Sequence, residues 1–131
     1  MATIQRFEDL IAWQKARALA RDVYLLTRDE AFRKDFGLAS QIQRAAVSVM
    51  ANLAEGYERR RRVEFHRYVE IAKASCAEVS SHLYVALDVG YLESSRFETL
   101  QEQISELQRI LAGLKASLSS EPRASGLGPR N

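Results

Sequence analysis

Hydrophobic residues recur at helical spacing along most of the chain. Between Ala12 and Leu26 the apolar positions advance alternately by four and three residues, which places them on one face of a helix. Glu8 and Asp9 precede this pattern, where carboxylates interact favourably with the exposed N–H groups of a helix start. The pattern predicts a helix over residues 6–28. Three further apolar residues widen its stripe, namely Trp13, Ala20 and Tyr24.

A polar stretch, "RDEAFRKDFG" at residues 28–37, then interrupts the helical pattern. It contains two large apolar side chains, Phe32 and Phe36. We expect both to lie in a loop and to be buried against the body of the protein, because burial removes a large apolar area from water. Their burial would hold the connection in place.

Apolar residues at the same four-three spacing predict three more helices. Amphipathic helices joined by short connections can bury their apolar faces only against one another, and short connections make sequential neighbours antiparallel. The sequence therefore predicts an all-α fold, an antiparallel up-down-up-down four-helix bundle over residues 1–118. The remaining residues, 119–131, are rich in Ser, Gly and Pro without periodicity, which is typical of a disordered tail. The three additional helices are expected over residues 38–58, 63–89 and 95–118.

A polar stripe also runs along the predicted helix over 38–58. Its members recur at spacings of three and four residues and so share one face. One interpretation is a solvated surface, as on any amphipathic surface helix. The other is a hydrogen-bonded polar seam against another helix or a subunit interface. The stripe consists of Gln41, Arg44, Ser48, Asn52 and Glu55.

The composition, 47% apolar and 27% charged, is that of an ordinary globular protein. A single cysteine excludes an intramolecular disulfide and the N-terminus lacks a signal-peptide pattern, so we expect a cytoplasmic protein. The longest apolar runs are far shorter than the ~20 residues that cross a bilayer, which argues against a membrane span. The net charge of +2 is unevenly distributed, because residues 36–62 carry five basic and two acidic side chains.

Residues that commonly carry catalysis or bind metals form no recognisable site in the sequence. Cys76 lies in the apolar stripe of the third helix, where a free cysteine is usually a small buried hydrophobe. His66 and His82 are sixteen residues apart, too far to hold one metal ion at helical spacing. None of the six glycines forms a nucleotide-binding loop motif. We therefore expect no catalytic residue, no metal site and no cofactor.

Four consecutive arginines in the stretch "EGYERRRRVEFHRY" provide the strongest local charge. One interpretation is a solvated turn between two helices. The other is a nucleic-acid contact, because arginine binds phosphate through a planar, bidentate fork. Tyr57 and Tyr68 are close enough in sequence to stack on exposed bases. The candidate phosphate-binding residues are Arg59, Arg60, Arg61, Arg62 and Arg67.

Three segments carry a resemblance to a known family. They read "FEDLIAWQKARALARDVY", "FGLASQIQRAAVSVMANLAEGYERR" and "EFHRYVEIAKASCAEV", with "GYL" after the last. The chain resembles the bacterial four-helix-bundle proteins encoded in 23S rRNA intervening sequences, a family that includes the accessory protein of diversity-generating retroelements. The most specific pieces are residues 40–45 and 52–56. Met50 departs from a frequent proline of the family, and Ala74 from a frequent glycine.

The resemblance implies a homopentamer of four-helix bundles around a central channel. For the retroelement relatives it also implies binding to nucleic acid and to a reverse transcriptase. The polar stripe on the second helix matches family positions, which favours a polar seam there.

Three functions compete at this stage. The first is a non-enzymatic, oligomeric protein that binds RNA or DNA through the arginine run, where several copies would add their contacts by avidity. The second is a protein-binding adaptor or scaffold with no nucleic-acid role. The third is a small enzyme whose site is assembled between subunits. Salt dependence separates the first two, since phosphate binding weakens steeply as salt rises.

Overall fold

The computed structural model describes residues 3–119. Of the tail predicted over residues 119–131, Ser119 is instead the last residue of a helix, and residues 120–131 lie outside the described residues. Of the four predicted helices, the first is shorter than expected, because Leu10 has an extended backbone that separates a single 3-10 turn from the helix proper. The elements are η1 (Phe7–Asp9), α1 (Ile11–Leu26), α2 (Glu30–Lys34), α3 (Phe36–Glu58), α4 (Arg62–Asp88) and α5 (Ser94–Ser119).

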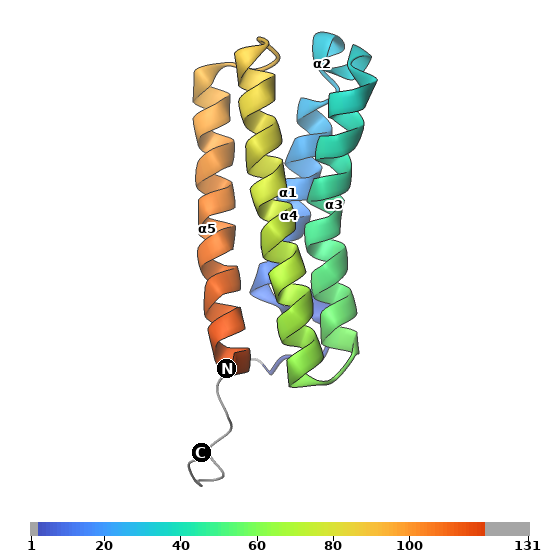
Figure 1. The fold of residues 1–131 in the computed structure, drawn as a ribbon, viewed down its shortest axis with the longest axis vertical. Helices are drawn as coiled ribbons and strands as arrows, with labels where there is room; N and C mark the ends of the chain where they lie inside the picture. Colours follow the sequence, from blue (N-terminus) through green and yellow to red (C-terminus); the bar gives the residue numbers. More distant parts are fainter. Residues whose placement is uncertain (1–2, 120–131) are drawn as a thin grey trace, which may run out of the picture.

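The four long helices form an antiparallel up-down-up-down bundle, as predicted (Figure 1). α3 packs against α1 and α4, and α5 packs against α4 and α1, so the helices close into a four-cornered ring. The α3–α4 connection lies at the same end of the bundle as the last turn of α5, and α2 lies at the opposite end (Figure 1). Residues 3–119 contain no strand and no helix long and apolar enough to span a bilayer.

The apolar stripes of the long helices meet in one continuous core. Side chains such as Leu19, Leu53, Leu83 and Leu111 are fully buried there. Cys76 is buried among them, in the stripe where the sequence placed it. Each buried aliphatic side chain of this size contributes roughly 1.5–3 kcal/mol relative to an exposed one.

The α1–α3 connection corrects the prediction made for its phenylalanines. Phe32 lies on the short helix α2 and is fully buried, with its ring stacked on Tyr91 at 4.9 Å between centroids. Phe36, in contrast, is 79% exposed, so the expectation that it is buried was wrong. It is the first residue of α3, and the side chain of Asp35 caps that helix by accepting a bond from the Leu38 N–H at 3.1 Å.

Tyr24 likewise differs from its neighbours in the first apolar stripe. Ala20 is buried and Trp13 packs partly against the core, whereas the Tyr24 side chain is 47% exposed. Its place at the edge of the stripe points the ring between α1 and α3 instead of into the core. α4 ends at Asp88, next to the predicted end at residue 89, and Gly90 beyond it takes a left-handed φ of 85°.

Candidate nucleic-acid interface at the α3–α4 connection

The arginine run forms a tight reversal between two long helices. Arg59 is the C-cap of α3, Arg61 is the extended N-cap of α4, and Arg62 is the first residue of α4. Arg60 between them has a φ of 62°, the left-handed region that non-glycine residues seldom adopt. This conformation costs roughly 1–3 kcal/mol, so the surrounding contacts must hold it in place.

Gly56 brings the two helices close together just before the reversal. A Cβ atom built on this residue would lie 2.5 Å from the Tyr68 Cβ and 3.0 Å from the Phe65 Cδ1. The Tyr68 Cβ is fixed to the α4 backbone and cannot turn away. The α3–α4 crossing at this end therefore depends on glycine, and it sets where the connecting arginines lie.

Side chains of the same chain hold Arg59 in place at the surface. Its Nη2 donates to the Tyr68 hydroxyl at 2.8 Å and to the Glu55 carboxylate at 3.2 Å, and its Nη1 lies 3.5 Å from the Glu64 carboxylate. The Tyr68 hydroxyl in turn donates to Glu55 at 3.2 Å. The hydrogen bond to Glu55, reinforced by the charges around it, raises the pKa of Arg59. We call these four residues, Glu55, Arg59, Glu64 and Tyr68, the Arg59 brace.

The other arginines of the run differ in their contacts. Arg62 donates to the carbonyl of Ser117 at 2.8 Å, which ties the connection to the last turn of α5. The guanidinium of Arg60 lies 5.1 Å from the centre of the Tyr57 ring, and that of Arg67 lies 5.6 Å from the Tyr68 ring. Arg61 is exposed and makes no ion pair with the described residues. Arg60, Arg61 and Arg67 therefore present charge to solvent, whereas Arg59 and Arg62 also serve the fold.

The polar stripe on α3 divides into two parts. Ser48 shares a hydrogen bond of 2.9 Å with Ser75 of α4, and Asn52 donates to the Ser48 hydroxyl at 2.9 Å. Glu55 continues this line into the Arg59 brace. Gln41 and Arg44, nearer the start of α3, are exposed to solvent. Within one chain the stripe is thus a polar seam against α4 over its second half and a solvated face over its first.

The side chains considered as catalytic or metal-binding residues were Cys76, His66 and His82. Burial raises the pKa of the Cys76 thiol to about 12, so it is protonated at neutral pH and a poor nucleophile. Within residues 3–119, no group of three or more His, Cys, Asp or Glu side chains gathers to hold a metal ion. The two histidines of α4 do not form such a group either.

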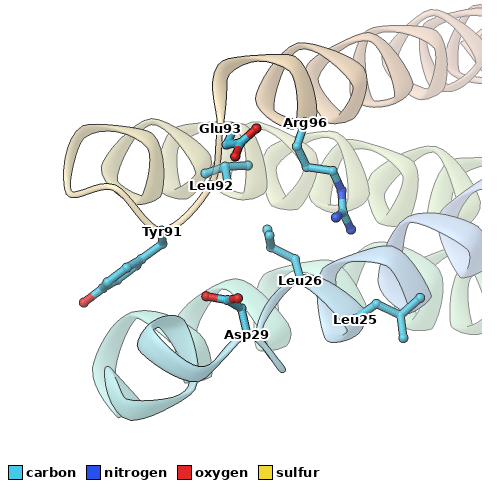
Figure 2. A pocket seen from close by; sticks show the side chains of 7 residues that line it. All are labelled: Leu25, Leu26, Asp29, Tyr91, Leu92, Glu93 and Arg96. Carbon is cyan, nitrogen blue, oxygen red and sulfur yellow. The ribbon is translucent and has the colours of Figure 1, made fainter.

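A hollow of about 370 Å³ opens at the end of the bundle away from the arginine run (Figure 2). It lies between the end of α1 and the α4–α5 turn, and its charged residues are Asp29, Glu93 and Arg96. Arg96 extends from α5 toward Leu25 and Leu26 (Figure 2). Its lining residues do not combine a nucleophile with a base and an orienting group, so we assign no chemistry to this hollow.

The sequence of this chain matches the model of a known protein family. Residues 8–113 match the family model described as 23S rRNA-intervening sequence protein. The chain belongs to this family. The match includes α1, the α3–α4 connection with its arginines, and most of α5.

One solved structure shares the fold of this chain. It is the crystal structure of a protein of unknown function from the S23 ribosomal protein family of Bacteroides thetaiotaomicron, with a TM-score of 0.75 and 20% sequence identity. The similarity covers 81% of this chain and 96% of that one. At this identity the likeness concerns the fold. No curated protein sequence matches the chain.

Helical spacing did not reveal the roles of two residues, Gly56 and Tyr68, that position the α3–α4 connection in this family member. Gly56 reads as an ordinary glycine near a helix end, and Tyr68 as a potential base-stacking ring. Their roles depend on contacts across α3 and α4, which helical spacing alone does not reveal. The one signal in the sequence was the spacing of Glu55 and Arg59, four residues apart, which predicts an ion pair on one helix.

Proposed function

We propose that this 23S rRNA-intervening sequence protein is a non-enzymatic homo-oligomer, a pentamer, that binds nucleic acid, with RNA as the preferred ligand. Arg60, Arg61 and Arg67 form the phosphate contact. The observation that carries the proposal is their presentation at one end of a rigid bundle. The family description, which links these proteins to 23S rRNA, supports RNA over an acidic protein.

Rigidity matters because ordering flexible arginines costs free energy on binding. A mobile loop would lose roughly 0.5–1.5 kcal/mol for each long side chain it immobilises. Here the Arg59 brace and the Arg62–Ser117 bond hold the backbone before any ligand arrives. The ring of Tyr57 lies against the Arg60 guanidinium, which supports this exposed side chain without neutralising its charge.

Self-association is supported by exposed aliphatic side chains on one side of α4. Ile71 and Val85 of α4 and its C-cap Val89 are exposed, and their spacing places them on that side, which also carries the exposed Glu78. Val47 of the neighbouring helix α3 is exposed as well. Exposed aliphatic side chains along one helix face favour burial against another subunit. In a pentamer each copy would repeat the basic end, and weak contacts would add through avidity.

The direct test replaces Arg60 and Arg61 with glutamine. Binding to a labelled structured RNA should weaken, and the slope of log K against log salt should fall by roughly 0.7–0.9 for each phosphate that the variant no longer neutralises. Helicity should be unchanged, because both side chains are exposed. Light scattering should give a mass near five times the 14.8 kDa chain for wild type and variant alike.

The comparison must be made at equal oligomer mass, since loss of the pentamer would lower affinity by itself. An unchanged affinity and an unchanged salt slope would contradict the phosphate assignment and favour the adaptor function. A monomer at all concentrations would contradict the oligomeric part of the proposal.

A further inference from the structure

A second cluster of arginines lies far from the α3–α4 connection, in a groove between α1 and α3. The groove contains a hollow of about 590 Å³ whose lining includes four arginines and no carboxylate. On α3 its lining extends from Gln43 to Met50, which precede Glu58 by fifteen and eight residues, roughly 22 Å and 12 Å along the helix at 1.5 Å per residue. The four lining arginines are Arg17, Arg21, Arg28 and Arg33.

The hollow continues into two neighbouring hollows. It shares Arg17 and Arg21 with one of about 400 Å³ toward the start of α1. It shares Thr27, Arg33 and Gln43 with one of about 300 Å³ that extends to Phe36. Because these linings overlap, the three hollows adjoin one another, and we call them together the α1–α3 trough. At Leu25 the first hollow also adjoins the hollow of Figure 2.

The arginines of the trough have few internal partners. Arg21 forms an exposed ion pair with Asp22 at 3.4 Å, and Arg17 lies 5.7 Å from the Trp13 ring centre. The side chains of Arg28 and Arg33 make no hydrogen bond or ion pair with any residue from 3 to 119. Asp29, which follows Arg28 in sequence, lines the other hollow shown in Figure 2. Arg28 and Arg33 therefore bring positive charge to the trough that no carboxylate among residues 3–119 pairs with.

The floor of the trough is apolar and partly aromatic. Tyr24 is half exposed, and Leu25 and Met50 line the same hollow. Gln43 donates to the Thr27 hydroxyl at 2.8 Å, which satisfies the buried hydroxyl and joins α3 to the end of α1. Phe36, the most exposed ring of the connection, stands at the far end of the trough. Arginines along an apolar, ring-bearing floor match a ligand that alternates phosphates with planar bases.

We propose that the α1–α3 trough binds a single-stranded nucleic-acid segment, with phosphates on Arg17, Arg28 and Arg33 and a base on Tyr24. The inference rests on the proposed nucleic-acid function and adds a second, strand-selective contact to it. A duplex is a poorer fit, because a ring such as Tyr24 stacks only on bases that are not already stacked in a helix. The basic connection and the trough would then engage different parts of one RNA.

The experiment compares three pairs of substitutions in the full chain. The trough pair is Arg28→Gln with Arg33→Gln, and the connection pair is Arg60→Gln with Arg61→Gln. A matched control, Arg96→Gln with Arg109→Gln, removes the same charge from exposed positions of α5. Binding is measured by fluorescence anisotropy with a labelled single-stranded oligouridine of about 12 nucleotides, within the usual site sizes for single strands.

The trough pair should weaken oligouridine binding at least tenfold more than the control, and the salt slope should fall by roughly 0.7 for each phosphate that is no longer neutralised. Tyr24→Ala should weaken oligouridine binding about tenfold and leave an abasic strand of equal charge unaffected, because only the base stacks on the ring. Circular dichroism and light scattering on each variant establish that helicity and mass are unchanged.

Several outcomes would overturn the inference. If only the connection pair weakens binding, the proposed function stands and the trough is not its strand site. If the trough pair and the control pair weaken oligouridine binding equally, the effect comes from the loss of positive charge in general and not from the trough. If polyglutamate displaces oligouridine at an equal concentration of negative charge, and Tyr24→Ala does not change oligouridine binding, the trough binds acidic chains in general. If the wild-type protein binds neither structured RNA nor oligouridine, the proposed function fails together with the inference.

Discussion

Gly56→Ala tests whether the close approach of α3 and α4 positions the arginine connection. In an open helix, replacing glycine with alanine stabilises the fold by roughly 0.5–1 kcal/mol, because glycine loses more backbone freedom on folding. At Gly56 the new methyl group would lie 2.5 Å from the Tyr68 Cβ. Relieving such a contact inside a packed interface costs roughly 1–3 kcal/mol. The clash outweighs the gain over most of this range, so we expect Gly56→Ala to be destabilising by roughly 1 kcal/mol.

Gly113→Ala provides a matched control. Gly113 also lies inside a long helix, α5, and a Cβ built there meets no atom within 4 Å. This variant should be stabilised by roughly 0.5–1 kcal/mol. The difference between the two variants isolates the interhelical contact, because the backbone contribution is common to both. We expect that difference to be about 1–3 kcal/mol.

Urea unfolding followed by far-ultraviolet circular dichroism measures both variants at one protein concentration. Any shift of α4 that accommodates the methyl group would also move Tyr68, so the Arg59 brace should loosen. Faster amide hydrogen exchange at the end of α3 in Gly56→Ala would report this change. If the unfolding free energies of the two variants agree within about 0.5 kcal/mol, the close approach of α4 to residue 56 does not affect stability, and the prediction is wrong.

Two further predictions concern the core and its edge. Phe32→Ala should lower the free energy of unfolding by about 3–5 kcal/mol, because its fully buried ring also stacks on Tyr91, whereas Phe36→Ala should change it by less than about 0.5 kcal/mol. Equal effects of the two substitutions in thermal or urea unfolding would contradict the observed burial. Burial raises the pKa of the Cys76 thiol to about 12 from an ordinary value of 9.0, so only the unfolded chain ionises the thiol in that interval. The contribution of the buried thiol to the free energy of unfolding is fully present below pH 9 and declines as pH rises toward 12. Cys76→Ala should be about 1 kcal/mol less stable than wild type at pH 7. Because the variant has no thiol, its stability should fall less than that of wild type between pH 9 and 12. Fast reaction of the native thiol with DTNB at pH 8 would contradict it.

Helical periodicity in the sequence determined the bundle and most of its core. A four-three spacing fixes which residues share a face of their own helix, and a helix with one apolar face has few ways to bury it. The positions of Leu19, Leu53, Leu83 and Cys76 follow directly from that spacing. The sequence also located the arginine run between two helices, since the run interrupts the apolar pattern.

The tertiary structure decided what each of those arginines does. The partners of Arg59 and Arg62 include Tyr68 and Ser117, which lie nine and fifty-five residues away in the chain. Only packing brings such groups together, so the sequence could not separate the arginines that hold the fold from those that face solvent.

The same reason explains Tyr24, Phe36 and the α1–α3 trough. Spacing orients a side chain relative to its own helix, but its exposure depends on how closely the neighbouring helix approaches at that level of the bundle. Tyr24 stands at the margin of its stripe, where α1 and α3 leave a hollow instead of closing over the ring. The trough combines residues of α1, α2 and α3 whose charges are unremarkable one by one. Their concentration on one surface arises from the crossing of the helices, which no single segment of the sequence encodes.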